Sequence, residues 1–200
     1  MKIKNIENIK GFMPAHEGEA LTRWSQKFSK QGPLLEIGTF CGKSTIYICK
    51  GAEINNQNVF TIDHHQGSEE HQLNQEYFDE EIYDFENNCV NTFPIFKKNM
   101  HEFKIKNIIP IVADSNDVAQ SWSTKLSLLF IDGSHSFKSA NADYNNWEGF
   151  IKRSCALVIH DIFEDPTKGG QAPYEIYKRA LNDGYKLYER VDTIVCLIKI

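Results

Sequence analysis

The sequence predicts a doubly wound α/β domain with a seven-stranded, mostly parallel sheet that contains one antiparallel strand. Five short apolar segments alternate with segments that can form helices, which is the order expected of parallel strands joined by helical crossovers. The apolar runs are continuous rather than alternating, so we expect helices to cover both faces of each strand. Two further runs near the C-terminus are typical of a hairpin, which requires one antiparallel strand.

The expected elements follow in order along the chain. Leu21, Trp24 and Phe28 lie at helical spacing and predict a cap helix within residues 1–30, ahead of an α/β core over residues 33–200. The five expected parallel strands cover residues 33–38, 58–63, 108–113, 126–131 and 155–159. Helices are expected over residues 43–50 and, as a long acidic stretch with aromatic residues, over residues 69–100. The hairpin strands are expected over residues 184–190 and 193–198.

The composition is that of one globular domain over residues 1–200, with 41% hydrophobic and 24% charged residues. A net charge of −5 argues against a nucleic-acid partner, because phosphate binding depends on a surplus of Lys and Arg. No apolar run approaches the roughly 20 residues that cross a bilayer, and no apolar signal segment opens the chain, so no membrane partner is expected. The five cysteines form no Cys-x-x-Cys pair, which favours reduced thiols in a cytoplasmic protein. Assembly into a homo-oligomer is compatible with this composition.

Polar residues end each of the predicted parallel strands. Gly38 follows the first strand, Asp63 the second and Asp114 the third, while Asp132 and the pair His160-Asp161 end the last two. Ligands of such sheets bind outside the carboxyl ends of the strands, where the strand order reverses. We therefore expect these side chains to meet at a single crevice.

The glycine loop from Gly38 to Gly42 has two chemical interpretations. With Lys43-Ser44 it is similar to a phosphate loop, and the strand ending at Asp132 would then supply a magnesium ligand. A phosphate loop has four residues between its glycines, however, and this loop has three. The acidic Glu36 would also repel a triphosphate, which favours a nucleoside ligand that carries an amino acid and no phosphate. A third interpretation is a turn that only packs helix on strand.

Several motifs, in order along nearly the whole chain, carry a family resemblance. They are Gly11-Phe12-Met13, the run from Glu36 to Thr45, Ile62-Asp63-His64-His65, Ala113-Asp114-Ser115, Asp132-Gly133-Ser134-His135 and Ile159-His160-Asp161-Ile162. The chain resembles class I S-adenosylmethionine-dependent methyltransferases, and among them a small bacterial family related to macrocin-type sugar O-methyltransferases and cephalosporin hydroxylase. His64 stands where the family usually has proline.

The resemblance implies S-adenosylmethionine as the cofactor and a Rossmann-like methyltransferase fold. Glu36, Gly38 and Gly42 would line the methionine and ribose side, together with Thr39 and Ser44 of the same loop. Asp63 and His64 would hold the ribose, and Asp114 with Ser115 would border the adenine. Asp132 would face the methionine amino group or a metal ion.

The cluster of Asp132, His135, His160 and Asp161 has three interpretations. In the first, Asp132, His160 and Asp161 bind a divalent metal that lowers the pKa of an acceptor hydroxyl. A mixed imidazole–carboxylate set suits Mn²⁺, Fe²⁺ or Zn²⁺ better than Mg²⁺. In the second, no metal is bound and Asp161 orients the acceptor. In the third, His160 and Asp161 are structural. His135 is the expected general base under both functional interpretations, because imidazole accepts a proton at neutral pH.

The predicted function is O-methylation of a small hydroxylated molecule, such as a sugar, with His135, Asp132 and Asp161 as catalytic residues. Two alternatives stay open. One is a nucleotide-binding enzyme of the phosphate-loop type. The other is a S-adenosylmethionine-binding, oxygenase-like protein that transfers no methyl group.

Overall fold

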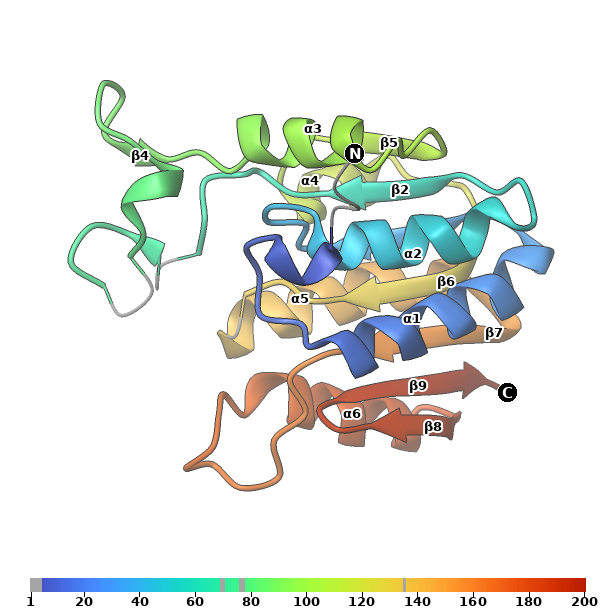
Figure 1. Ribbon diagram of the computed structural model, residues 1–200. Helices are drawn as coiled ribbons and strands as arrows, with labels where there is room; N and C mark the ends of the chain where they lie inside the picture. The colour runs from blue at the N-terminus through green and yellow to red at the C-terminus, as the bar shows by residue number, and fades with distance from the viewer. Residues whose placement is uncertain (1–4, 69–70, 76–77, 135) are drawn as a thin grey trace.

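A seven-stranded sheet forms the centre of the molecule in the computed structural model, which describes residues 5–68, 71–75, 78–134 and 136–200 (Figure 1). Its strand order is β5-β2-β1-β6-β7-β9-β8. The strands are β1 Leu34–Ile37, β2 Val59–Ile62, β5 Ile108–Ile111, β6 Leu126–Ile131, β7 Ile151–Ile159, β8 Tyr185–Val191 and β9 Ile194–Lys199. Strand β9 is antiparallel to β7 and β8, and the other pairs are parallel. The predicted fold class is thus confirmed.

Helices cover both faces of this sheet, as Figure 1 shows. One layer contains α1 Ala15–Phe28, α2 Lys43–Glu53 and α3 Phe93–Glu102, and the other contains α4 Ser115–Gln120, α5 Phe137–Trp147 and α6 Ala172–Asn182. Successive strand residues point to opposite faces. Leu34 accordingly packs with α1 and α2, whereas Leu35 packs with α5 and α6. Both are fully buried, which explains why the apolar runs are continuous in sequence.

Helix α1 is the expected cap helix. Its residues Leu21, Trp24 and Phe28 are buried against the sheet and α2. Gly18 lets the two helices approach closely, because a Cβ atom there would lie 2.2 Å from the ring of Tyr47. The helix therefore forms part of the main apolar core.

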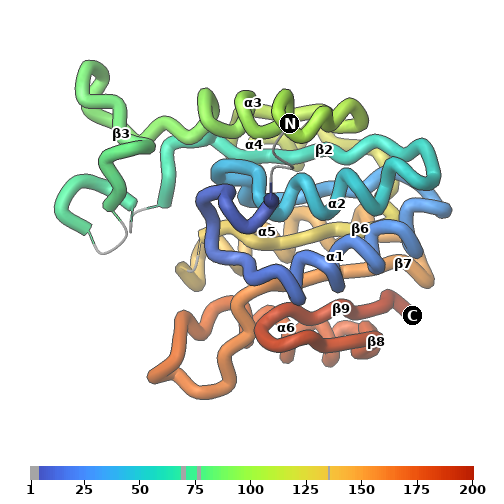
Figure 2. Tube along the Cα trace, viewed as in Figure 1, coloured from blue at the N-terminus to red at the C-terminus, as the bar shows by residue number. Residues whose placement is uncertain are grey.

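The expectation of a long helix over residues 69–100 was wrong. Among the described residues of this stretch, a 3-10 helix (Glu80–Ile82) leads into a short hairpin of β3 (Tyr83–Asp84) and β4 (Cys89–Val90), and α3 begins only at Phe93. The carboxylates of Asp79 and Asp84 accept hydrogen bonds from backbone N–H groups two and three residues ahead. Such local bonds compete with helix formation. The segment instead projects beyond the sheet, at the left of Figure 2.

The parallel ladder continues beyond the strand ends. The N–H of Gly38 donates to the carbonyl of Ile62 at 3.1 Å, and the N–H of Asp132 donates to that of Ile37 at 2.9 Å. The N–H of His160 likewise donates to Ile131 at 3.3 Å. These bonds fix the first loop residues of β1, β6 and β7 side by side at one edge of the sheet.

The cysteines are free thiols, and Cys41, Cys49, Cys155 and Cys196 are buried while Cys89 is half-buried. This agrees with the expected reduced thiols inside apolar segments. A helix with the length and apolar character needed to span a bilayer does not occur in the described part of the chain.

Candidate functional site

A cavity of about 400 Å³ lies at the carboxyl edge of the sheet. Its walls come from the loops after β1, β2, β5, β6 and β7 and from the segment before α1. The predicted convergence of the strand ends is therefore what the structure shows. The predicted site residues that line the cavity are Gly38, Thr39, Ser44, Asp63, His64, Asp114, Ser115, Asp132, His160 and Asp161. His135 lies outside the described residues.

The glycine loop is held in place by Asp63. The backbone N–H groups of Thr39 and Phe40 donate to Oδ2 of Asp63 at 2.8 and 2.7 Å, and that of His65 donates to Oδ1 at 2.7 Å. Gly38 has φ +86°, and a Cβ atom there would lie 2.1 Å from the carbonyl oxygen of Asp132. Only glycine fits this close approach between the loops after β1 and β6. Asp63 is thus oriented by three amides while it lines the cavity.

Glu36 and Gly42 do not line the cavity, although both are predicted cofactor residues. Glu36 lies behind the loop, fully buried, where the hydroxyls of Ser44 and Thr45 donate to its two carboxyl oxygens at 2.5 Å each. Burial raises the pKa of Glu36 to about 8, and the two hydroxyl bonds only partly oppose this rise. Gly42, with φ +87°, begins α2 and packs against Phe96 and Met100 of α3. In this structure both residues contact α2 or α3 next to the loop, and neither lines the cavity.

The part of the cavity wall formed by the loop after β5 and by α5 carries a second group of polar residues. Asp114 caps α4 by accepting a hydrogen bond from the N–H of Asn116 at 2.8 Å, and the hydroxyl of Ser115 donates to Asp143. Asp143 of α5 is buried, and this burial raises its pKa to about 6 against the lowering effect of the Ser115 bond. Asp143 is not among the site residues predicted from the sequence. The feature that could have identified it is its position in the buried stripe of α5, which also contains Ala140, Tyr144 and Trp147.

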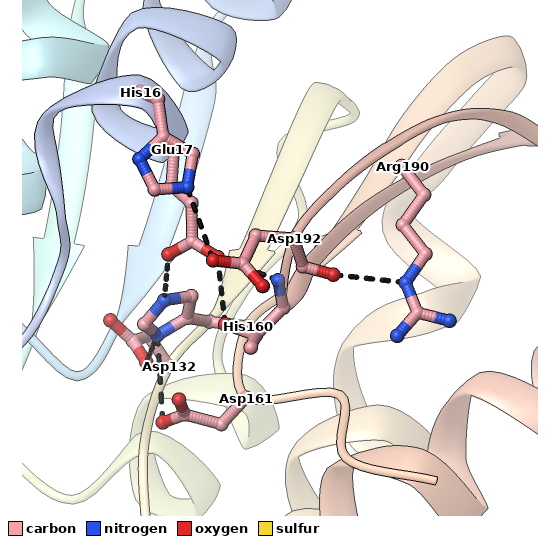
Figure 3. Close-up of polar contacts among 8 residues, drawn as sticks. His16, Glu17, Asp132, His160, Asp161, Arg190 and Asp192 are labelled. Atoms are coloured by element: carbon pink, nitrogen blue, oxygen red, sulfur yellow. Dashed lines mark hydrogen bonds and ion pairs between the residues drawn. The ribbon is translucent and has the colours of Figure 1, made fainter.

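His160 joins two elements at the centre of the site, as Figure 3 shows. Its Nδ1 lies 3.0 Å from Oδ1 of Asp132 and 3.5 Å from Oδ2 of Asp161, and its Nε2 lies 2.8 Å from Oε2 of Glu17. The imidazole is 4% exposed. Burial disfavours its charged form, but the charge of Asp132 and the hydrogen bonds to Asp132 and Glu17 outweigh this and raise the pKa of His160 well above its usual value.

Glu17 is the main site residue that the sequence did not predict. It comes from the first turn of α1 and is fully buried. Burial alone would raise its pKa, yet the hydrogen bond and charge of His160 and the bonds from Thr193 lower it. The signal for Glu17 is its spacing: it lies four residues before Leu21, in the stripe that continues to Trp24 and Phe28. A charged residue in such a stripe needs a buried partner.

Asp132, His160 and Asp161 form a group that fits a metal ion. One ligand atom from each residue lies within 4.8 Å of the others. The contact of Nε2 with Glu17 leaves Nδ1 of His160 on the side of the two carboxylates. In metal sites, the ring nitrogen of a histidine ligand that does not bind the metal commonly donates a hydrogen bond to a carboxylate. The structure therefore brings the three predicted metal ligands close together.

This fold and site are those of Rossmann-like methyltransferases: strand β9 is inserted antiparallel beside β7, and a glycine loop after β1 faces the cavity. The chain belongs to the family described as "Methyltransferase domain", whose match covers residues 35–162. The predicted resemblance to class I S-adenosylmethionine-dependent methyltransferases is thus confirmed at the level of family and fold. The match begins after the cap helix and ends just after His160-Asp161.

Solved structures agree with this assignment. The O-methyltransferase NovP matches with a TM-score of 0.67 and 14% identity, over 92% of this chain and 79% of that one. The O-methyltransferase from Bacillus cereus in complex with S-adenosylhomocysteine matches with a TM-score of 0.63 and 16% identity, over 96% and 86%. TomG from Streptomyces achromogenes, an O-methyltransferase of tomaymycin synthesis in complex with S-adenosylmethionine, gives 0.62 and 11%, over 94% and 82%. At these identities the likeness establishes the fold.

Proposed function

We propose that this protein is a S-adenosylmethionine-dependent O-methyltransferase that acts on a small hydroxylated molecule, such as a sugar. One observation carries the proposal. The glycine loop and the group of Asp132, His160 and Asp161 line the same cavity. The glycine loop would bind the cofactor, and the group of Asp132, His160 and Asp161 would bind the acceptor hydroxyl close to the cofactor.

The cofactor assignment is supported by the chemistry of the cavity wall. S-adenosylmethionine carries ribose hydroxyls and an amino group, which are hydrogen-bond donors, and carboxylates accept from such groups. Asp63 would receive the ribose hydroxyls, and Asp114 with Ser115 would border the adenine. The Bacillus cereus and Streptomyces achromogenes neighbours hold S-adenosylhomocysteine and S-adenosylmethionine in their crystal structures. The short loop argues against a triphosphate, whereas Glu36 is buried and does not line the cavity, so it has no part in excluding one.

The protein's part in the reaction is positioning and proton removal. The sulfonium of the cofactor supplies an electrophilic methyl group, so the chain must align the acceptor oxygen with it. Transfer would form an oxygen–carbon bond to the acceptor and break the sulfur–carbon bond of the cofactor, whose electron pair would stay on sulfur. The acceptor loses its hydroxyl proton, and we assign His135 as the base that takes it.

We propose further that Asp132, His160 and Asp161 hold a divalent metal ion. When bound, such an ion lowers the pKa of a coordinated hydroxyl and orients it. The mixed oxygen and nitrogen donors favour Mn²⁺, Fe²⁺ or Zn²⁺ over Mg²⁺. Asp161 has φ +57°, a left-handed conformation, so the backbone turns away from the direction of β7 immediately after His160. Strained backbone of this kind is concentrated at functional sites.

Two measurements test the assignment. Isothermal titration should show binding of S-adenosylhomocysteine and no binding of ATP; tight ATP binding without S-adenosylhomocysteine binding would identify a phosphate-loop enzyme instead. Labelled methyl groups from S-adenosylmethionine should then appear in a product across a panel of sugars and phenols. Cofactor binding with no labelled product would favour the oxygenase-like alternative. Activity that survives exhaustive chelation would exclude an essential metal while leaving the transferase assignment in place.

A further inference from the structure

We propose that Glu17 is a positioning residue of the metal site: it binds Nε2 of His160 and so presents Nδ1 to the metal ion. This inference rests on the metal ion proposed above. It assigns a part in the site to α1, which lies outside the region matched by the family. Figure 3 shows Glu17 on the opposite side of the imidazole from Asp132 and Asp161.

The geometry of the imidazole carries the first step. Nε2 of His160 lies 2.8 Å from Oε2 of Glu17, and an ionised carboxylate only accepts hydrogen bonds, so Nε2 must carry a hydrogen. By the same rule Nδ1, 3.0 Å from the carboxylate of Asp132, carries a hydrogen while no ion is bound. A bound ion would leave the hydrogen that Nε2 donates to Glu17 and would take the place of the one on Nδ1. Nδ1 faces Oδ1 of Asp132 at 3.0 Å and Oδ2 of Asp161 at 3.5 Å. Glu17 thus holds the imidazole with Nδ1 toward the two carboxylates, where it can join them as a ligand.

Glu17 is itself held by a second element. Its Oε1 accepts hydrogen bonds from both the N–H and the hydroxyl of Thr193, each at 2.7 Å. Thr193 lies in the turn between β8 and β9. One carboxylate oxygen of Glu17 therefore accepts hydrogen bonds from the hairpin, and the other binds the imidazole. A fully buried glutamate with both oxygens engaged has little freedom to turn away.

A buried ion pair of purely structural value would have the same distances, so stability alone cannot test the proposal. The distinguishing property is metal affinity, because a carboxylate behind a histidine ligand raises the basicity of the ligand and fixes its orientation. Loss of such a partner typically weakens metal binding by about 10- to 100-fold. Thr193 offers a matched control, since its hydroxyl donates to the other oxygen of Glu17, Oε1, and not to the one that binds His160.

The experiment is a titration of the full-length protein with Co²⁺, followed by its visible absorption bands. The wild type should bind Co²⁺, and Glu17→Gln should bind it about 10- to 100-fold more weakly with altered band positions. Thr193→Val should lose some stability but keep a Co²⁺ affinity within about threefold of the wild type, because Oε2 of Glu17 stays in place. S-adenosylhomocysteine affinity should be unchanged in both variants, which shows that the cavity is intact.

Each outcome decides a separate point. If the wild type binds no Co²⁺, the proposed metal site is wrong and this inference falls with it. If the wild type binds Co²⁺ and Glu17→Gln binds it equally well, the metal site stands and the role of Glu17 is refuted. Should Glu17→Gln fail to fold, Glu17→Asp replaces it: the shorter side chain keeps the charge but withdraws it from Nε2, and an unchanged Co²⁺ affinity would again refute the role.

Discussion

Three buried carboxyl groups differ in their protonation because their partners differ. Glu17 faces the imidazole of His160, so its pKa is lowered despite burial. Glu36 has only hydroxyl partners, and burial raises its pKa to about 8. Asp143 is an intermediate case, with Ser115 as its partner and a pKa of about 6. At the scale of single residues, the charge of the partner decides whether a buried acid in this fold is ionised at neutral pH.

Glu36→Gln is expected to flatten the pH dependence of stability. Between its ordinary pKa of 4.5 and its native value of about 8, the folded chain holds a proton that the unfolded chain has lost. Wild-type stability therefore falls as pH rises through this window. The variant should be the more stable protein at pH 8 by up to a few kcal/mol. Urea unfolding at pH 5, 6.5 and 8 measures this.

The exposed Glu53 of α2 provides the control for that experiment. Glu53→Gln should keep the wild-type pH dependence. Asp143 leaves part of the slope in every variant, since its pKa is also raised. Parallel wild-type and Glu36→Gln curves would show that Glu36 is ionised in the fold at neutral pH.

His135→Ala is expected to lower the rate of methyl transfer by about 10²- to 10⁴-fold, because it removes the proposed general base. The affinity for S-adenosylhomocysteine should stay nearly unchanged. Single-turnover kinetics and isothermal titration measure the two quantities. His101→Ala, an exposed histidine on α3, should change neither. A parallel loss of cofactor affinity in His135→Ala would refute the assignment.

The sequence predicts those site residues that directly follow the ends of strands. Asp63, Asp114, Asp132 and His160-Asp161 follow recognisable strands, and a parallel sheet brings such residues together whatever else the chain does. Glu17 and Asp143 lie within helices instead. Which sheet edge a helical residue faces depends on how its helix packs, so their partners could not be read from spacing alone.

At the scale of elements, the loops after β1 and β6 are so close that the backbone of one occupies the space of a side chain on the other. Gly38→Ala is expected to destabilise the protein by at least about 2 kcal/mol, because its Cβ atom would lie 2.1 Å from backbone oxygen at φ +86°. Urea unfolding and cofactor titration measure the effect.

Gly149→Ala is the matched control for this substitution. Among the described residues, no atom lies within 4 Å of the position that a Cβ atom would take there. The control should stay within about 0.5 kcal/mol of the wild type. Equal stabilities of the two variants would contradict the close approach of the two loops.

The elements were predictable where packing and local preference agree. The strands and α2 follow continuous apolar runs and a glycine loop, and their bounds differ from expectation by a few residues. The segment over residues 69–100 is acidic and contains aromatic residues, which suggested a helix. There the turns formed by Asp79 and Asp84 prevail, and Phe78, Tyr83 and Phe85 pack on one another rather than along a helix face.

At the scale of the whole molecule, α1 joins the C-terminal hairpin of β8 and β9 to the centre of the sheet. Trp24 is buried, and its indole N–H donates to Glu189 of β8 at 2.6 Å. Trp24→Ala should therefore cost about 3–5 kcal/mol of stability through lost burial and packing. Chemical denaturation measures this cost.

Arg23 gives the comparison for Trp24, because it contacts the same glutamate from an exposed position at 2.9 Å. Arg23→Ala should cost less than about 1 kcal/mol, as exposed ion pairs do. A similar loss in both variants would mean that the contact with Glu189, and not the apolar burial of Trp24, holds α1 in place.

The bond between Glu17 and Thr193 spans 176 positions of the chain. Closing so long a loop has a large entropic cost, which contacts formed earlier must already offset. We therefore expect the central parallel strands to pair first and the environment of His160 to form late in folding. In the reverse direction, a partial opening that releases the hairpin or α1 would disconnect His160 while leaving the glycine loop intact. Such a molecule would still bind its cofactor but would not transfer the methyl group.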